Sequence, residues 1–240
     1  MILPFEQLLV LGAICIYLFD SALLLQPNQL IMVCSDDKWT FGLPSARWEI
    51  LRKHPYLPNP VTPHRGLFPA TWFQIADSCE IDTLISRQLL LGAMRPIQIA
   101  SILLLLLLFL GLPITLLLMH TSTAFIGLLV LIYLDIIFML AFAVKRRQKL
   151  MLSKSDLVKL AFDALACPPL AVNMVRRISV RQPFTGNPIA LARRAGFDEL
   201  ARSMAIQITP RVTEMLEIEN DEEIRDRLAR FKHELQETQN

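Results

Sequence analysis

Two aspartates lie inside long apolar stretches, and they are the residues of this chain best suited to a chemical role. Asp135 lies near the middle of the stretch 124–144, and Asp20 lies near the end of the apolar stretch that begins the chain. A charged carboxylate at the centre of a membrane helix costs about 2.5–3.5 kcal/mol, so such residues usually have a partner or a function. The apolar stretches contain no Lys, Arg or His. We therefore expect no basic partner for Asp135 at that depth within this chain.

Three roles are open for Asp135. Its carboxyl group can be protonated and hydrogen-bonded, with the neighbouring Tyr133 as a helper. It can relay protons or ions, as intramembrane acids do in pumps and transporters. It can also pair with a basic group on another subunit.

The rest of the sequence contains no motif typical of catalysis or metal binding. G-x-S-x-G, H-E-x-x-H and glycine-rich phosphate loops are all missing from it. Cys34, His54, His64 and Cys79 could bind zinc, but they lack the close pair that structural zinc sites contain. We expect no catalytic residue, no metal and no cofactor, and we infer no small-molecule substrate.

The apolar stretches themselves predict three transmembrane helices. Residues 97–119 and 124–144 are separated by a short polar turn, and each is long enough to cross about 30 Å of hydrocarbon. Residues 1–25 are the third candidate, because a signal peptide would need a basic start and a small-residue cleavage site, and neither is present. Composition agrees, since 53% hydrophobic and 19% charged residues indicate a mixture of bilayer and water-exposed parts.

Basic residues beside these stretches predict the orientation of the chain. Four of the five residues after Val144 are Lys or Arg, and such an excess is typical of cytoplasmic flanks. The N-terminus and the turn at Thr121 are then outside, and the other soluble parts are cytoplasmic, as in a multi-pass protein of a bacterial inner (plasma) membrane. We expect the bilayer to be a partner through anionic inner-leaflet headgroups. The membrane-surface basic residues are Lys145, Arg146, Arg147, Lys149, Arg176, Arg177 and Arg181.

The predicted fold class is a mainly α membrane protein. It has three transmembrane helices (N-out, C-in), a small β-containing cytoplasmic segment between the first and second spans, and a helical cytoplasmic C-terminal domain. The chain divides into a transmembrane helix at 1–25, a cytoplasmic strand and proline-rich segment at 26–76, an amphipathic interfacial helix at 77–95, a transmembrane helical hairpin at 96–144, and a basic-then-acidic helical cytoplasmic domain at 145–240.

Between the first and second spans, the pattern predicts strands and then a helix. Gln29–Cys34 and Trp39–Phe41 form a strand, turn and strand unit. Five prolines between residues 54 and 69 exclude a helix and a central strand, which leaves either an extended strap packed on the domain or a ligand for an aromatic groove. Ser78 is the expected N-cap of an amphipathic helix that lies along the inner membrane surface.

Capping residues predict the helices of the C-terminal domain. Ser153 caps a helix that ends before Pro168, and Asn187-Pro188 opens a short helix. One helix is expected from Asp198 to Ile208, and another is expected to begin at Thr209-Pro210.

The last helix begins within Asn220–Glu223, where acidic residues suit the positive end of the helix dipole. It has a narrow apolar seam: Ile224, Leu228, Phe231 and Leu235. Such a seam suits contact with a partner helix or a groove, but it can also pack on the chain's own helices.

These features favour a non-enzymatic accessory or assembly subunit of the inner membrane. It would dock a protein partner, or a second copy of itself, through its cytoplasmic helices. One alternative is a subunit of a proton- or ion-coupled transporter that uses Asp135 and Asp20, and another is a membrane-bound enzyme of unknown reaction. We expect no nucleic acid partner, because lipid contact is the simpler role for a basic segment beside the bilayer.

Overall fold

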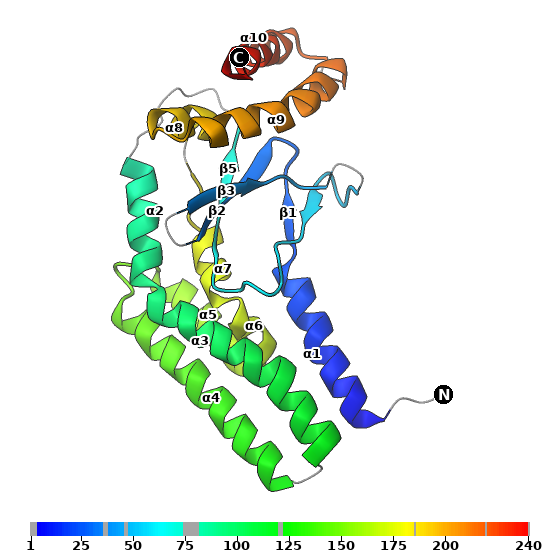
Figure 1. The fold of residues 1–240 in the computed structure, drawn as a ribbon, viewed down its shortest axis with the longest axis vertical. Helices are drawn as coiled ribbons and strands as arrows, with labels where there is room; N and C mark the ends of the chain where they lie inside the picture. Colours follow the sequence, from blue (N-terminus) through cyan, green and yellow to red (C-terminus); the bar gives the residue numbers. More distant parts are fainter. Residues whose placement is uncertain are drawn as a thin grey trace.

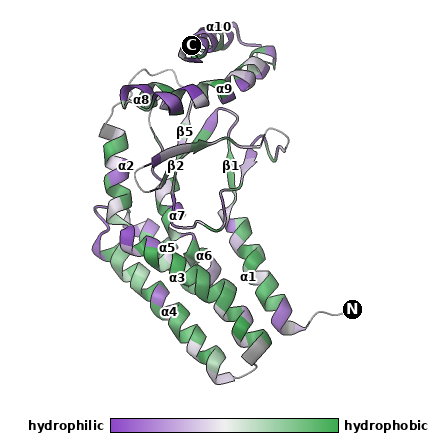
Figure 2. Ribbon diagram, viewed as in Figure 1, coloured by the Kyte–Doolittle hydropathy of each residue, from purple (hydrophilic) through white to green (hydrophobic). Residues whose placement is uncertain are grey.

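The computed structural model describes residues 4–35, 38–45, 48–73, 82–119, 122–184, 186–218 and 220–239. It is mostly helical and contains a small antiparallel sheet. Figure 1 shows one group of helices at one end of the molecule, the sheet in the middle and a second group of helices at the other end. Hydrophobic residues dominate the first end, and hydrophilic residues are most frequent at the other (Figure 2).

Three helices make up the apolar end: α1 (Phe5–Ser21), α3 (Arg95–Leu106) and α4 (Ser122–Lys145). Helix α3 continues through two π-helical segments, η1 (Leu107–Gly111) and η2 (Ile114–Met119). Residues Arg95–Leu117 and Ser122–Lys145 are each long and apolar enough to cross a membrane, with a mean hydropathy of 2.7. Only 33% of each is buried within the protein, so most of this apolar surface faces outward.

Pro113 lies between the two π-helical segments η1 and η2. Proline has no backbone N–H, so one bond of the helical ladder is missing. Just after it, the hydroxyl of Thr115 donates to the carbonyls of Gly111 and Leu112, at 2.9 Å and 3.1 Å. Helices α3 and α4 come close at Gly111, where an added Cβ would lie 2.9 Å from Leu128 Cδ1. A glycine there permits the tight pairing of the two helices.

The central sheet has three antiparallel strands in the order β3-β2-β5. They are β2 (Gln29–Ser35), β3 (Lys38–Gly42) and β5 (Gly66–Thr71). The predicted unit of two strands is confirmed by β2 and β3. Strand β5 was not predicted, because it contains Pro69, yet proline is tolerated on an edge strand. The Pro69 carbonyl points outward and accepts from Phe184 N at 2.8 Å, so its missing N–H costs no bond to β2.

A second strand pair lies beside the end of α1. Strand β1 (Leu23–Leu25) pairs with β4 (His54–Tyr56). The proline-rich segment is extended where it forms β4 and where it enters β5, as predicted. Between these strands it forms turns instead, in which Thr62 N donates to the Asn59 carbonyl at 3.2 Å and Arg65 N donates to the Thr62 carbonyl at 3.4 Å.

Aromatic side chains form the core on the central sheet. The rings of Trp39, Phe68 and Phe184 lie with centroids 5.5–5.9 Å apart. Trp72 is fully buried, whereas Trp48 is 69% exposed on a loop. Two of the three tryptophans thus belong to the interior of the domain.

Helix α2 (Asp82–Ala93) connects the sheet to α3. Figure 1 shows it running beside the sheet, from the start of α3 toward the polar helices. Leu84, Leu90 and Leu91 are buried, while Ile85 and Leu89 are 49% and 69% exposed. The expected N-cap, Ser78, lies outside the described residues.

Three helices return the chain from α4 to the sheet: α5 (Lys154–Ala166), α6 (Pro168–Val172) and α7 (Met174–Val180). The predicted cap of α5 is confirmed, since Ser153 Oγ accepts from Asp156 N at 3.0 Å and Asp156 Oδ2 accepts from Ser153 N at 3.3 Å. Helix α5 runs back beside α4, and the Tyr133 hydroxyl donates to the Leu165 carbonyl at 3.4 Å. Helix α6 packs against α1, α3 and α4, and α7 reaches β5. Because Tyr133 is near the middle of α4, the end of α5 lies level with the apolar helices.

The polar end consists of α8 (Pro188–Arg194), α9 (Asp198–Ile218) and α10 (Glu222–Gln239). Asn187 caps α8 as predicted, with its Oδ1 accepting from Ile189 N at 2.9 Å. Asp221 Oδ1 accepts from Glu223 N at 2.9 Å, which confirms the start expected for α10.

The predicted break at Thr209-Pro210 is wrong, because α9 is one continuous helix through Pro210. The Thr209 hydroxyl donates to the Ala205 carbonyl at 2.7 Å, within the turn that the proline disturbs. Ile208 and Val212, on either side of the proline, are both fully buried. Their packing outweighs the roughly 3 kcal/mol that a proline costs inside a helix.

Candidate functional site

An ion cluster lies where α1 meets α7, beside the start of β1. Arg177 Nη2 donates to Asp20 Oδ1 at 2.6 Å, and its Nη1 donates to Asp163 Oδ2 at 2.6 Å. Asn173 Nδ2 donates to Asp20 Oδ2 at 3.0 Å. Asp20 therefore has a basic partner within this chain, because α7 folds back and brings Arg177 from 157 positions away.

The two carboxylates keep Arg177 charged inside the protein. Its side chain is 23% exposed, and that of Asp20 is 14% exposed. Burial alone would lower the pKa of Arg177, but hydrogen bonds and charge from Asp20 and Asp163 outweigh burial and raise the pKa above its usual value. The pair is therefore an ionised link between helices.

Arg176 joins the proline-rich segment to the same place. It is only 3% exposed, and its Nη2 donates to the carbonyls of Asn59 at 2.6 Å and Thr62 at 2.9 Å. The hydroxyl of Tyr17 on α1 donates to the Pro60 carbonyl. Burial lowers the pKa of Arg176 below its usual value. Of the two alternatives for the proline-rich segment, these contacts make it a strap on its own chain.

A cavity of about 360 Å³ opens beside the cluster. Its polar lining consists of Asp20, Ser21, Asp163, Asn173, Arg176, Arg177 and Arg181. The carboxylates and guanidinium groups bind one another across its wall, and Arg181 pairs with Asp156 at 2.7 Å. These ion pairs and hydrogen bonds link α1, α5 and α7, so the arrangement is suited to a structural role. The guanidinium groups of Arg176 and Arg177, which were expected at the membrane surface, are used inside the protein.

Asp135 lies on the inner face of α4. It is 9% exposed, and its neighbours on that face, Ile132, Ile136 and Met139, are fully buried. Its Oδ2 has no hydrogen-bond partner among the described residues, and the Tyr133 hydroxyl donates to Leu165 rather than to the carboxyl. Asp135 and Asp20 are therefore in different environments, one unpartnered and one paired.

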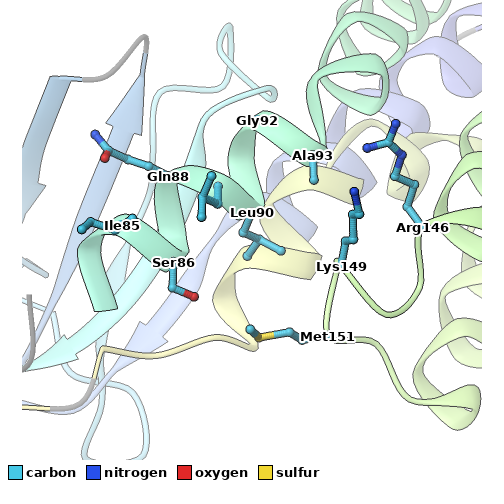
Figure 3. Close-up of a pocket in the computed structure, with 10 residues that line it drawn as sticks. Ile85, Ser86, Gln88, Leu90, Gly92, Ala93, Arg146, Lys149 and Met151 are labelled. Carbon is cyan, nitrogen blue, oxygen red and sulfur yellow. The ribbon is translucent and has the colours of Figure 1, made fainter. Parts of the chain in front are cut away.

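The four basic residues that follow Val144 lie at the end of α4 and in the turn after it: Lys145, Arg146, Arg147 and Lys149. Arg146 and Lys149 line a cavity of about 850 Å³ between this turn and α2. Figure 3 shows both side chains extending toward Ala93, where α2 gives way to α3.

The seam of α10 packs within the chain. Leu228, Phe231 and Leu235 are buried, and the Phe231 ring stacks on Trp72 with centroids 5.8 Å apart. Ile224 is 36% exposed. Of the two alternatives for this seam, packing on the chain's own elements is the one observed for its three buried members.

The cysteines and histidines named as potential zinc ligands do not form a metal centre in the described part of the chain, which holds no group of three or more His, Cys, Asp or Glu side chains suited to a metal ion. Cys34 is buried in β2, and His54 Nδ1 lies 3.1 Å from the carbonyls of Ser45 and Trp48. Cys79 lies outside the described residues.

Arg87 is a further buried cation that the sequence pattern did not single out. It is 9% exposed on α2, and it donates to Gln182 Oε1 at 3.3 Å and to the Pro183 carbonyl at 3.1 Å. Burial lowers its pKa. In the sequence, the only sign of this role is that Arg87 lies among apolar positions of the predicted helix. The structure shows that Arg87 joins α2 to the segment after α7.

The fold is mostly helical, and two of its described helices are long and apolar enough to cross a membrane. Comparisons with protein families, with curated proteins and with solved structures found no match.

Proposed function

We propose that this chain is a non-enzymatic, integral inner-membrane accessory or assembly subunit with three spans, N-out and C-in. Its cytoplasmic part is a rigid platform that docks a protein partner. The observation that carries the proposal is the division of the molecule into an apolar helical end and a polar end that holds the sheet and α8–α10 (Figure 2).

The outward surface of the apolar end supports the membrane location. On α4, Leu134, Ile137 and Phe138 are each more than half exposed, and Phe19 on α1 is 86% exposed. Exposing such a large apolar surface to water is unfavourable, whereas lipid chains solvate it.

The ends of the helices support the orientation. The start of α1 and the start of α4 lie at the same end of the molecule, and the basic turn after Lys145 lies at the end nearer the sheet (Figure 1). With the basic turn in the cytoplasm, the sheet and α8–α10 are cytoplasmic as well.

The partner would dock on α9, which has exposed apolar side chains, rather than on the α10 seam. Ile206 and Ile218 on α9 are 54% and 71% exposed, whereas the seam residues Leu228 and Leu235 are buried. A partner can reach the first pair without unfolding the chain.

Cysteine labelling in intact cells tests the topology. In a chain with its native cysteines replaced, Thr123→Cys should react with an impermeant thiol reagent, and Arg230→Cys should react only after the cells are opened. Labelling of Arg230→Cys in intact cells would contradict the proposal.

A second candidate function, a proton- or ion-coupled transporter subunit, is favoured by the unpartnered Oδ2 of Asp135. Replacing a buried polar group that has no partner is nearly neutral or stabilising. Asp135→Leu should therefore accumulate normally in either case. A variant that accumulates, keeps its partner and yet loses activity in the cell would support the transporter, whereas a fully active variant would exclude it.

A further inference from the structure

We infer that the cavity between α2 and the turn after α4 binds an anionic phospholipid of the cytoplasmic leaflet, with its phosphate between Arg146 and Lys149. The inference rests on the proposed membrane location and specifies which lipid chemistry the protein selects and where. The cavity of about 850 Å³ is lined by two cations from the turn and by apolar side chains from α2 (Figure 3).

The cations of this cavity have no acid to neutralise them. Among the described residues, neither Arg146 nor Lys149 takes part in an ion pair, and none of the residues that line the cavity is acidic. Figure 3 shows both side chains on the same side of the turn, so two positive charges can reach one phosphate. A basic side chain near the membrane surface contributes about 1 kcal/mol to binding an anionic lipid.

The remaining wall of the cavity suits a lipid better than a free anion. Leu89 and Met151 are 69% and 54% exposed at its rim, and Ile85 is 49% exposed farther along α2. A soluble phosphate would gain nothing from these side chains, whereas an amphiphile would cover them.

A row of aromatic rings leads from the cavity along α4. The Arg146 guanidinium lies 5.4 Å from the centroid of Phe142, and Phe142 lies 6.5 Å from Phe138. Phe138 is 52% exposed on the apolar face that we assign to lipid. Residues four apart share one face of a helix, so a phosphate held at Arg146 leaves an acyl chain on this row.

Lipid binding to the full-length, detergent-purified chain tests the site, with dioleoyl phosphatidylglycerol as the probe and dioleoyl phosphatidylcholine as the neutral comparison. We expect selective binding of phosphatidylglycerol. Arg146→Gln with Lys149→Gln should weaken it roughly 30-fold, since each cation contributes about fivefold. The matched control, Lys145→Gln with Arg147→Gln, removes the same charge from the same region and should weaken binding less than threefold.

Further measurements distinguish a specific lipid site from diffuse surface attraction and from a site for free anions. Equal loss in the two double variants would mean diffuse surface attraction, and wild-type binding without preference for phosphatidylglycerol would also overturn the site. Leu89→Ser should weaken lipid binding, whereas Ile206→Ser on α9 should not. Displacement of the lipid by excess inorganic phosphate would identify a site for free anions and overturn the lipid proposal.

Alkaline carbonate extraction of membranes that contain the chain, done beside the lipid-binding assay, distinguishes failure of the site from failure of the proposed function. A chain that is embedded in membranes but does not select phosphatidylglycerol would overturn the lipid site alone. A chain that is not embedded in membranes would overturn the proposed function and the lipid site together.

Discussion

At the scale of single residues, Arg177 is the side chain on which several elements depend. Its two hydrogen-bonded carboxylates come from α1 and α5, and its own backbone belongs to α7. The two ion pairs differ in exposure, because Asp20 is 14% exposed and Asp163 is 41% exposed. The first pair is the more enclosed of the two, so its loss should cost more stability.

Asp20→Asn should lower the stability of the folded protein by about 3 kcal/mol, because it leaves the guanidinium of Arg177 partly buried with one carboxylate fewer. Asp163→Asn, the matched control, should cost less than about 1 kcal/mol. Thermal unfolding in detergent measures both. The double variant Asp20→Asn with Arg177→Gln should recover part of the loss, and equal effects of the two single variants would contradict the assignment.

At the scale of elements, α10 is part of the fold rather than a free arm. Three residues of its seam are buried against α9 and the sheet, and Phe231 stacks on Trp72. Removing these contacts should loosen α9 as well.

Leu228→Ala should cost about 2–5 kcal/mol, because Leu228 is fully buried and the change leaves a cavity. Ile224→Ala on the same seam is the control and should cost much less, since Ile224 is 36% exposed. Hydrogen exchange of the α9 and α10 amides measures the difference. Unchanged exchange in Leu228→Ala would mean that α10 is free to dock elsewhere.

Helix α5 combines exposed apolar side chains with a position beside α4. Val158 and Phe162 are 69% and 72% exposed on one stripe, and the end of the helix contacts the middle of α4. An exposed apolar stripe at that level should face lipid.

A spin label at Phe162→Cys should therefore be accessible to oxygen, which concentrates in lipid, and protected from a water-soluble nickel chelate. The control label at Ile206→Cys, 54% exposed on α9, should show the opposite preference. Access of the nickel chelate to the first label would place α5 in water.

At the scale of the whole molecule, the apolar end determines how the chain should behave in a cell. Two helices with a mean hydropathy of 2.7 face outward over most of their surface. The protein should stay in the membrane pellet after extraction with alkaline carbonate and should enter solution only with detergent. Release by carbonate alone would mean that another protein, rather than lipid, covers α3 and α4.

Local and periodic features could be predicted from the sequence because they depend on residues close to one another in the chain. The apolar runs of α3 and α4, the caps at Ser153 and Asn187, and the strands β2 and β3 are all of this kind. The prediction that the basic turn after Val144 lies at the membrane surface also rests on residues adjacent in the chain. It stays a prediction.

Contacts between distant segments were decided only by the tertiary structure. Arg177 meets Asp20 because α5 and α6 fold back against the apolar helices, and no local pattern encodes that return. Pro69 is accepted in a strand because β5 is at the edge of the sheet, and Pro210 is accepted in α9 because buried neighbours hold both halves. In each case the free energy of packing, which depends on the whole fold, outweighs a local preference.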